Sequence, residues 1–498
     1  MEPLMELFTI GFPTALTFQN VSYCFVGAFL GMVVGVIPGI GSMMAITLLL
    51  PLTYYLDPIT AIVMLGGVYY GAEYGGSTAS ILLNLPGTES SAIVALDGYP
   101  MTKQGRAGVA LLVRTLASFF GGCVGILMMM WLSPLFVALA LSFQSAEYFA
   151  VVLFALVASA TISQGSALKG LAMVVVGIML GCVGTDIYTG TNRFTFGMPD
   201  LYDAISVVVL AMGLFGVAEV IASAGKITAI SGSDTRVTVR SMMPTRDDMR
   251  RTVGPSMRGS GIGSFIGILP GAGPLVASLM SYAVEKRVSR RPEHFGRGAV
   301  EGVAGPEAAN NAAAQGAFIP TMSLGIPGSP TMAIVLGALM IHGIAPGPQL
   351  IAQNPELFWG LIASFWIGNL MLLVLNIPMI GIWVRLLRVP YRMLFPAIIV
   401  LISIGSFASQ NSVFDIWSVL AIGIFGYGIR LLGFEVAPLL VGFVLGPMLE
   451  EHFRRSMLLA RGDFLDVLAR PIAGTILAAT AILLFYSAWV AFRKRATT

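Results

Sequence analysis

Four short motifs combine proline and glycine, three of them with small hydroxyl residues, and they form two matching pairs. GVIPGIGS at 35–42 returns as GILPGAGP at 267–274, and NLPGTESS at 84–91 returns as GIPGSPT at 325–331. Proline lacks a backbone N–H and glycine accepts left-handed backbone, so each motif predicts a break in a helix. Paired breaks at corresponding places in two halves of a chain indicate a binding site between the halves.

The chemistry of such a site follows from the exposed ends of the interrupted helices. Free N–H groups and the positive dipole end at a helix N-terminus bind anions, and neighbouring hydroxyls donate to carboxylate oxygens. The predicted substrate-binding residues are Ser42, Asn84, Thr88, Ser90, Ser91, Asn310, Asn311, Ser329 and Thr331. Freed carbonyls on the other side of a break can hold a cation such as Na⁺. The predicted cation-binding residues are Gly39, Gly41, Pro86, Gly87, Gly271, Gly273, Pro327, Gly328 and Glu73.

Each of these assignments has a structural alternative. Small residues around a break can simply cap helices and let them pack closely. Asn310 and Asn311, in an alanine-rich segment, can contact substrate or ion, or can form hydrogen bonds between helices. Glu73 can bind the cation or form an internal ion pair, and Glu89 is expected to cap a helix or lie near a cation. The second copy carries Pro274 where the first has Ser42, so the two ends of the site should differ chemically.

The composition identifies the setting as a membrane. The 498 residues are 56% hydrophobic, and 11% are charged, where about 25% is usual for soluble domains. The net charge of +3 and the short basic runs between apolar stretches are not typical of a nucleic-acid-binding protein. The three cysteines and three histidines show no metal-binding or catalytic spacing. We therefore expect no enzyme, no metal centre and no cofactor.

Helices must carry the motifs across the bilayer. Nine continuous apolar runs approach the roughly 20 residues that a span requires. They lie at 18–37, 107–131, 145–163, 167–184, 203–222, 357–384, 394–408, 413–432 and 470–492. Ten shorter apolar pieces lie at 42–56, 58–72, 79–85, 91–96, 132–143, 260–269, 274–284, 312–326, 330–345 and 436–449. Interrupted segments of this kind are tolerated at membrane depth where other protein or a cavity satisfies the freed backbone groups.

These elements predict an all-α polytopic membrane protein of about 10–12 spans, built from two internal repeats. Each repeat should supply a broken helix at its first Pro-Gly motif and a re-entrant hairpin at its second. Inverted repeats are favoured, because matching tips would then reach one midplane site from opposite faces. The predicted divisions are a first repeat (1–222), a basic cytoplasmic linker (223–258), a second repeat (259–469) and a C-terminal helix with a basic tail (470–498). The second copy needs about nine extra residues, expected in the loop 286–297.

The motifs also carry a family resemblance. Residues 35–42, YYGAEYGGS at 69–77, 84–91, AANNA at 308–312 and IPTMSLGIPG at 319–328 resemble the large membrane subunit of tripartite tricarboxylate transporters. The resemblance implies uptake of tri- or dicarboxylates through the bacterial inner membrane, driven by a cation gradient, typically Na⁺. It also implies two protein partners, a small membrane subunit and a periplasmic solute-binding protein, and no nucleic acid.

Other functions stay open at this point. The chain could be a stand-alone Na⁺/carboxylate symporter that needs no binding protein. An ion channel is disfavoured, because the tips form two non-identical copies and not a symmetric ring. We expect the loaded site to move between the two sides of the membrane, by an elevator or a rocking motion.

Overall fold

The computed structural model is described here for residues 2–162, 166–186, 188–224, 237–387 and 391–496. Its first half contains α1 (Glu2–Glu6), η1 (Leu7–Gly11), α2 (Phe12–Ala15), α3 (Phe18–Val36), α4 (Gly41–Leu49), η2 (Leu50–Tyr55), α5 (Pro58–Leu83), α6 (Ala92–Lys103), α7 (Ala107–Ala140), α8 (Ser145–Ile162), α9 (Ala167–Gly181), β1 (Gly184–Thr185), β2 (Asn192–Arg193), η3 (Pro199–Leu201), α10 (Val207–Ala211), η4 (Met212–Val217) and α11 (Ala218–Ala224). Its second half contains η5 (Val239–Met242), α12 (Arg246–Ile268), α13 (Gly273–Val288), η6 (Pro292–His294), α14 (Glu301–Gly316), α15 (Phe318–Leu324), α16 (Pro330–Ile341), α17 (Gln349–Gln353), α18 (Pro355–Asn376), α19 (Ile380–Leu386), α20 (Tyr391–Gln410), α21 (Val413–Leu431), α22 (Ala437–Leu459), α23 (Phe464–Ala469) and α24 (Pro471–Ala496). The elements η1 and η4 are π-helical, and the other η elements are 3-10 helices.

The predicted all-α polytopic membrane fold is confirmed, and the breaks fall where the motifs predict them. Helix α3 ends at Val36 and α4 begins at Gly41, while 232 positions later α12 ends at Ile268 and α13 begins at Gly273. The second motif of each half lies in a turn between helices, α5 to α6 and α15 to α16. The extra residues of the second copy fall in 289–300, which overlaps the loop predicted to hold them.

A seam of glycines joins the two long helices of each repeat. A side chain at Gly31 of α3 would overlap the backbone carbonyl of Val68 in α5, and one at Gly263 of α12 would overlap that of Ala309 in α14. The same overlap occurs one helical turn away on both sides, at Gly27 and Gly35 in the first repeat and at Gly259 and Gly267 in the second. Small residues spaced four apart let membrane helices approach closely. The two repeats therefore share one packing geometry as well as one pattern of breaks.

Several helix boundaries differ from the predicted runs. The piece 58–72 and most of 79–85 belong to one helix, α5, because its polar residues are buried against protein and need no interruption. Likewise 132–143 is mostly the end of α7, which continues through Pro134. The run 357–384 is divided into α18 and α19.

Helix α12 begins inside the segment expected to be a linker. The Thr245 side chain accepts the N–H of Asp248, and the Asp248 carboxylate accepts the N–H of Thr245, which together form a capping box. This cap starts the helix at Arg246, so 246–258 continues into the second repeat. Most of the remaining linker, 225–236, lies outside the described residues.

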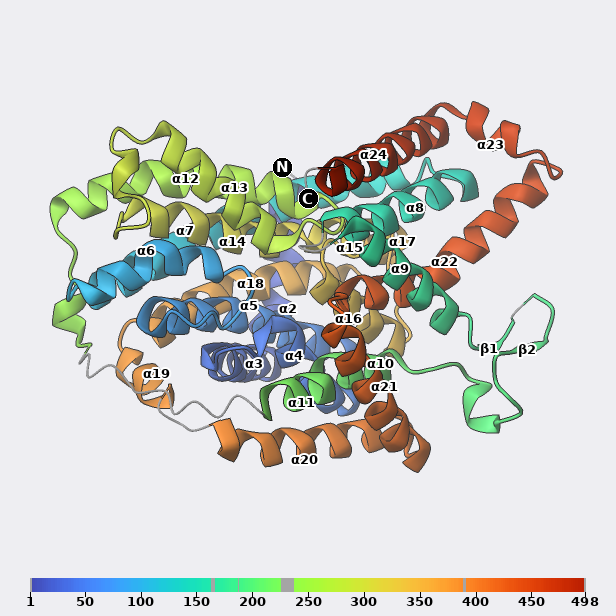
Figure 1. Ribbon diagram of the computed structural model, residues 1–498, viewed down its shortest axis with the longest axis horizontal. Coiled ribbons are helices and arrows are strands. Elements are labelled where there is room, and N and C mark those ends of the chain that lie inside the picture. The colour runs from blue at the N-terminus through green and yellow to red at the C-terminus, as the bar shows by residue number, and fades with distance from the viewer. Residues whose placement is uncertain (1, 163–165, 187, 225–236, 388–390, 497–498) are drawn as a thin grey trace.

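The burial of the helices shows which of them lie at the centre. Helices α5 and α14 are buried on every side along most of their length, and so is α16. Among the described residues, five helices are long and apolar enough to cross a membrane (α3, α7, α18, α21 and the Pro471–Val490 part of α24), and six apolar helices or helical segments are shorter. Helices α20, α21 and α24 lie on the outside, as Figure 1 shows, and expose apolar side chains.

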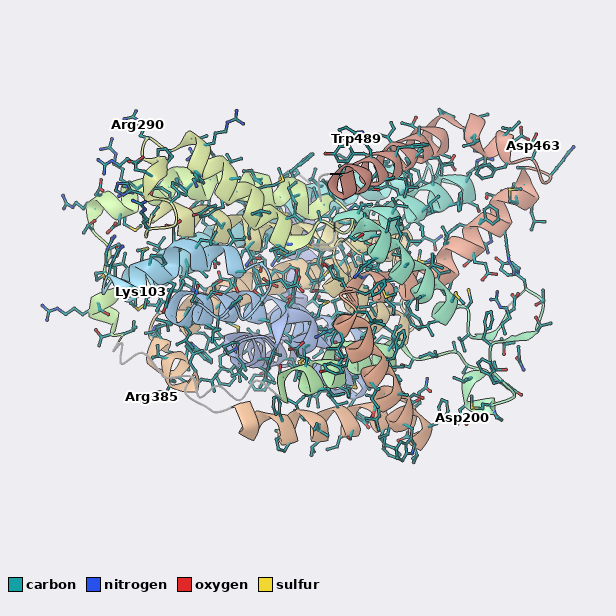
Figure 2. All side chains as sticks on the ribbon, viewed as in Figure 1. Lys103, Asp200, Arg290, Arg385, Asp463 and Trp489 are labelled. Carbon is teal, nitrogen blue, oxygen red and sulfur yellow. The ribbon has the colours of Figure 1, made fainter. Side chains whose placement is uncertain are left out.

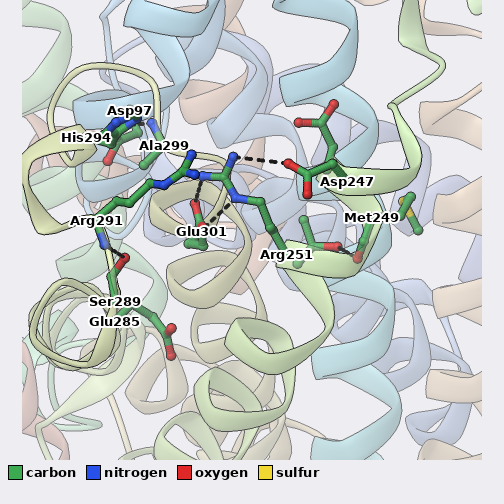
Figure 3. A network of polar contacts seen from close by, with 12 residues as sticks. Asp97, Asp247, Met249, Arg251, Glu285, Ser289, Arg291, His294, Ala299 and Glu301 are labelled. Atoms are coloured by element: carbon green, nitrogen blue, oxygen red, sulfur yellow. Dashed lines mark hydrogen bonds and ion pairs between the residues drawn. The ribbon is translucent and has the colours of Figure 1, made fainter.

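The two ends of the molecule differ in charge. Lys103, Arg290 and Arg385 lie at one end in Figure 2, while Asp200 and Asp463 lie at the other. The first end also holds a network of ion pairs around α12, shown in Figure 3, in which Arg251 reaches both Glu301 and Asp247. The three labelled basic residues therefore lie together at one end of the molecule.

At this end the extra loop of the second repeat binds the first repeat. The fully buried Asp97 of α6 accepts the backbone N–H groups of Gly296, Gly298 and Ala299 with one oxygen, at 2.8–2.9 Å. Its other oxygen accepts the hydroxyl of Tyr282, at 2.9 Å. The residues that lengthen the second copy thus connect the two repeats.

Candidate functional site

All four Pro-Gly breaks meet at one cavity of about 550 Å³. The first repeat contributes 39–44 and 86–90, and the second contributes 271–276 and 329–331. Segments from outside the motifs complete the wall, among them Ser159 and 434–438. The segments that the motifs predicted to form a site therefore come together in the folded chain.

The backbone at the first break of each repeat requires glycine. Gly39 and Gly41 have φ of 83° and 76°, and Gly271 and Gly273 have φ of 79° and 62°. This left-handed region is unfavourable for residues with a Cβ. In each repeat one hydrogen bond ties the first break to the second, from Gly39 N–H to Pro86 O and from Gly271 N–H to Gly328 O, both at 3.1 Å. The glycines and their prolines thus fix the shape of the cavity.

Four helices, α4, α6, α13 and α16, begin at or beside the cavity. Ser329 caps α16, because its side chain accepts the N–H of Met332. Ser91 lies at the N-cap position of α6, but its hydroxyl bonds to Ser80 and to the backbone of Thr88. Helix N-termini carry partial positive charge, and several of them around one cavity favour an anionic ligand.

One carboxylate lies at the cavity wall deep inside the protein. Glu73 of α5 is only 2% exposed, and its Oε2 accepts the Ser90 hydroxyl at 2.7 Å. Ser42 and Asn310 lie close enough to interact with the same carboxylate. No ion pair to Glu73 is found among the described residues. A carboxylate surrounded by hydroxyl and amide oxygens has the chemistry of a site for a small hard cation.

Asn310 brings the second repeat to this carboxylate. It is 1% exposed, and neither its amide nitrogen nor its amide oxygen has a hydrogen-bond partner in the described part of the chain. The hydroxyl of Tyr69 is also buried without a hydrogen-bond partner in the described part of the chain. Buried polar atoms without partners are costly, so these atoms are candidates for contact with a ligand.

A second buried carboxylate has a different setting. Glu307 of α14 accepts the hydroxyl of Ser118 at 2.7 Å and interacts with Arg114, which is fully buried. Arg114 also donates to the carbonyl of Tyr74 and to the side chain of Asn376. Glu307 and Arg114 thus lie near each other inside the protein, and neither lines the cavity.

The structure separates the predicted site residues into two groups. Those that line the cavity are Ser42, Thr88, Ser90, Ser329 and Thr331 of the substrate set and Gly39, Gly41, Glu73, Pro86, Gly87, Gly271 and Gly273 of the cation set. Those outside its lining are Asn84, Ser91, Asn310, Asn311, Pro327 and Gly328. Asn84 is exposed and ends α5 in the left-handed conformation, at φ 57°. Asn311 donates to the carbonyl of Glu307 within its own helix.

Sequence reasoning missed the charged residues that the remaining segments bring to the cavity. Glu219 of α11, Arg430 of α21 and Glu435 all line it. Glu219 and Arg430 form an ion pair across 211 positions of sequence. The available signal was a charged residue near the end of each of the apolar runs 203–222 and 413–432. No local sequence pattern links these two runs.

The fold and the cavity define a polytopic membrane protein with a two-repeat site, which is typical of membrane transporters. Residues 21–441 match the tripartite tricarboxylate transporter TctA family, and the chain belongs to that family. This agrees with the family resemblance of the motifs.

Two similar proteins come from Agrobacterium vitis. An uncharacterised 52.8 kDa protein of the TAR-I ttuC' 3' region is 50% identical over 481 residues, which cover 96% of this chain and 95% of the relative. An uncharacterised protein of the TAR-II ttuC' 3' region is 55% identical over 215 residues, which cover 43% of this chain and 89% of the relative. No solved structure matches the chain.

Proposed function

We propose that the chain is the large translocating subunit of a cation-coupled carboxylate transporter. The observation that carries this proposal is the meeting of all four Pro-Gly breaks, two from each repeat, around one cavity. Family membership supports transport of tricarboxylates in general. The cavity supplies N–H groups and hydroxyls that suit carboxylate oxygens.

In this mechanism the cation binds first. Na⁺ would bind at Glu73, with Ser42, Ser90 and Asn310 as neighbouring oxygen donors. Its charge offsets that of Glu73, so a carboxylate can then approach the helix N-termini in a favourable field. Thr88, Ser329 and Thr331 would contact the substrate from the cavity wall. Binding of cation and anion thereby becomes mutually favourable, which is the basis of coupled uptake.

The orientation follows from the distribution of charge. Because cytoplasmic loops are rich in Lys and Arg, the end that carries Lys103, Arg290 and Arg385 would face the cytoplasm of a bacterial cell. A periplasmic binding protein would then deliver substrate at the opposite end, and a small membrane subunit would pack against the apolar outer helices. The two repeats would be inverted, and the loaded site would move between the two sides as a unit.

Reconstitution tests this function. Liposomes containing the chain with its small subunit and binding protein should accumulate labelled citrate when a Na⁺ gradient is imposed, with saturable kinetics. Liposomes that contain the chain alone distinguish the stand-alone symporter, which would give the same uptake without partners. Uptake that neither saturates nor responds to an imposed Na⁺ or proton gradient would contradict cation-coupled transport.

A further inference from the structure

One guanidinium faces the central cavity. Of the described residues that line it, Arg430 is the basic one, whereas Glu73, Glu89, Glu219 and Glu435 are acidic. A carboxylate substrate that enters this cavity therefore meets four carboxyl groups and one guanidinium. How Arg430 is held decides whether that positive charge is accessible to a ligand.

Arg430 is held by groups that a ligand can replace. Its Nη1 donates to Oε2 of Glu219 in a short ion pair, and its Nη2 donates weakly to the carbonyl of Leu214, at 3.4 Å. The other oxygen of Glu219 accepts the hydroxyl of Ser223, at 3.1 Å. The two charged side chains are 28% and 20% exposed, so the pair is not sealed inside the protein. A guanidinium has five N–H donors, which leaves donors for a carboxylate.

The backbone around this pair is fixed although the pair itself is open. Lys169 of α9 donates to the carbonyls of Leu432 and Gly433, just beyond the end of α21, at 2.7 and 3.2 Å. Leu214 lies in the π-helix η4, which packs against α21. Single π-helical turns are rare and are frequent at functional sites. The guanidinium is therefore presented to the cavity from a helix that packs against η4 and whose C-terminal carbonyls are bound by Lys169.

We propose that Arg430 is the anchor for one carboxylate of the substrate, and that Glu219 occupies the guanidinium until the substrate displaces it. This inference rests on the proposed function and names the residue that recognises the carboxylate. Glu219 presents the same chemical group that the substrate carries, so one carboxylate replaces another at the guanidinium. The remaining carboxylates of a di- or tricarboxylate can reach the helix N-termini that line the same cavity.

The exchange also links substrate binding to cation uptake. When Glu219 leaves Arg430, its negative charge loses its partner while the substrate adds further negative charge. Glu89 and Glu435 already interact with each other and, in the case of Glu89, with Arg430. A cation or proton that enters with the substrate would restore the balance of charge at this end of the cavity.

Two substitutions with opposite expected effects on the Kd test whether Arg430 is the anchor. Binding of citrate, tricarballylate and succinate to the purified chain in lipid nanodiscs is measured by titration calorimetry. Glu219→Gln should lower the Kd severalfold, because the competing carboxylate is gone. Arg430→Gln should raise the Kd more than tenfold, and Arg430→Lys should recover only part of the loss, since an ammonium lacks the planar fork.

A double variant controls for folding. Arg430→Gln combined with Glu219→Gln leaves no unpaired charge, so it should fold and still bind weakly. Arg454→Gln, which removes an arginine paired with Asp186 and Glu450 outside the cavity, should bind like the wild type.

The outcomes separate the anchor from the proposed function. If Glu219→Gln and Arg430→Gln weaken binding equally, or if the double variant binds like the wild type, the pair is structural and the anchor is refuted. If the wild type binds none of the three carboxylates, the proposed function fails and the anchor fails with it.

Discussion

The glycine seam of the second repeat offers a matched test of how the breaks are held in place. Gly263 of α12 faces the backbone of Ala309 in α14 so closely that a Cβ would overlap its carbonyl oxygen. Gly261, two positions earlier in the same helix, has no atom within 4 Å of the corresponding Cβ position. Replacing each by alanine adds the same methyl group to the same helix in two different surroundings.

The expected difference follows from these surroundings. At Gly261 the substitution should be neutral or stabilising by up to about 1 kcal/mol, because alanine favours helix and restricts the unfolded chain. At Gly263 the added methyl must push α12 away from α14, and overpacking of this kind costs about 1–3 kcal/mol. The free energies of unfolding of the two variants should therefore differ by about 1–4 kcal/mol.

The comparison requires reversible unfolding of the purified protein, for example by steric trapping in detergent micelles. Gly31→Ala, at the equivalent position of the first repeat, should repeat the loss because it meets the carbonyl of Val68. Citrate binding should weaken in Gly263→Ala, since α12 ends at the break that lines the cavity. Equal stability of Gly261→Ala and Gly263→Ala would refute the view that the seam sets the position of the breaks.

Three further predictions concern the site and the contact between the repeats. Glu73→Gln should raise the Na⁺ concentration for half-maximal citrate uptake by about ten- to a hundredfold, since a charged ligand contributes roughly 1.5–3 kcal/mol. An unchanged Na⁺ dependence would count against Glu73 as the cation ligand. Single cysteines at Glu89 and Thr331, in a variant lacking Cys24, Cys123 and Cys182, should change their reactivity towards impermeant thiol reagents when Na⁺ and citrate are added, and constant reactivity would contradict a moving site. Asp97→Ala should destabilise the protein by about 1–3 kcal/mol, because three backbone N–H groups, of which that of Ala299 is buried, lose their acceptor. Asp97→Asn should lose less, and equal thermal stability of Asp97→Ala and wild type would show that the loop does not join the repeats.

Local chemistry explains why the breaks could be predicted from the sequence. Proline and glycine restrict or free the backbone at their own positions, so Pro38 with Gly39 and Pro270 with Gly271 mark helix ends without reference to anything distant. The small residues at Gly31 and Gly263 likewise indicate close helix packing. Features that depend on single residues and their sequence neighbours could therefore be predicted from the sequence.

Features that depend on packing were not accessible in this way. Helix α5 looks interrupted around Glu73 because its polar residues lower the local hydropathy, yet it continues because other helices bury them. The pair of Glu219 and Arg430 exists because α21 packs against η4, and no local pattern in either segment specifies the other. The π-helical turn of η4 has no sequence signature of its own.

The chemical asymmetry of the cavity follows from the way the repeat has diverged. Val68 and Ala309 occupy corresponding positions in the glycine seams of the two repeats, 241 residues apart. At the same offset, Ala314 corresponds to Glu73 and Asn310 corresponds to Tyr69. The buried carboxylate at the cavity wall thus comes from the first repeat, and the amide that approaches it comes from the second. A cation held between these two side chains would bridge the repeats and fix their relative position, whereas the four helix N-termini retain the symmetry that suits an anion. In the proposed mechanism, cation binding would therefore depend on residues that differ between the repeats, whereas anion binding would depend on helix N-termini that both repeats supply.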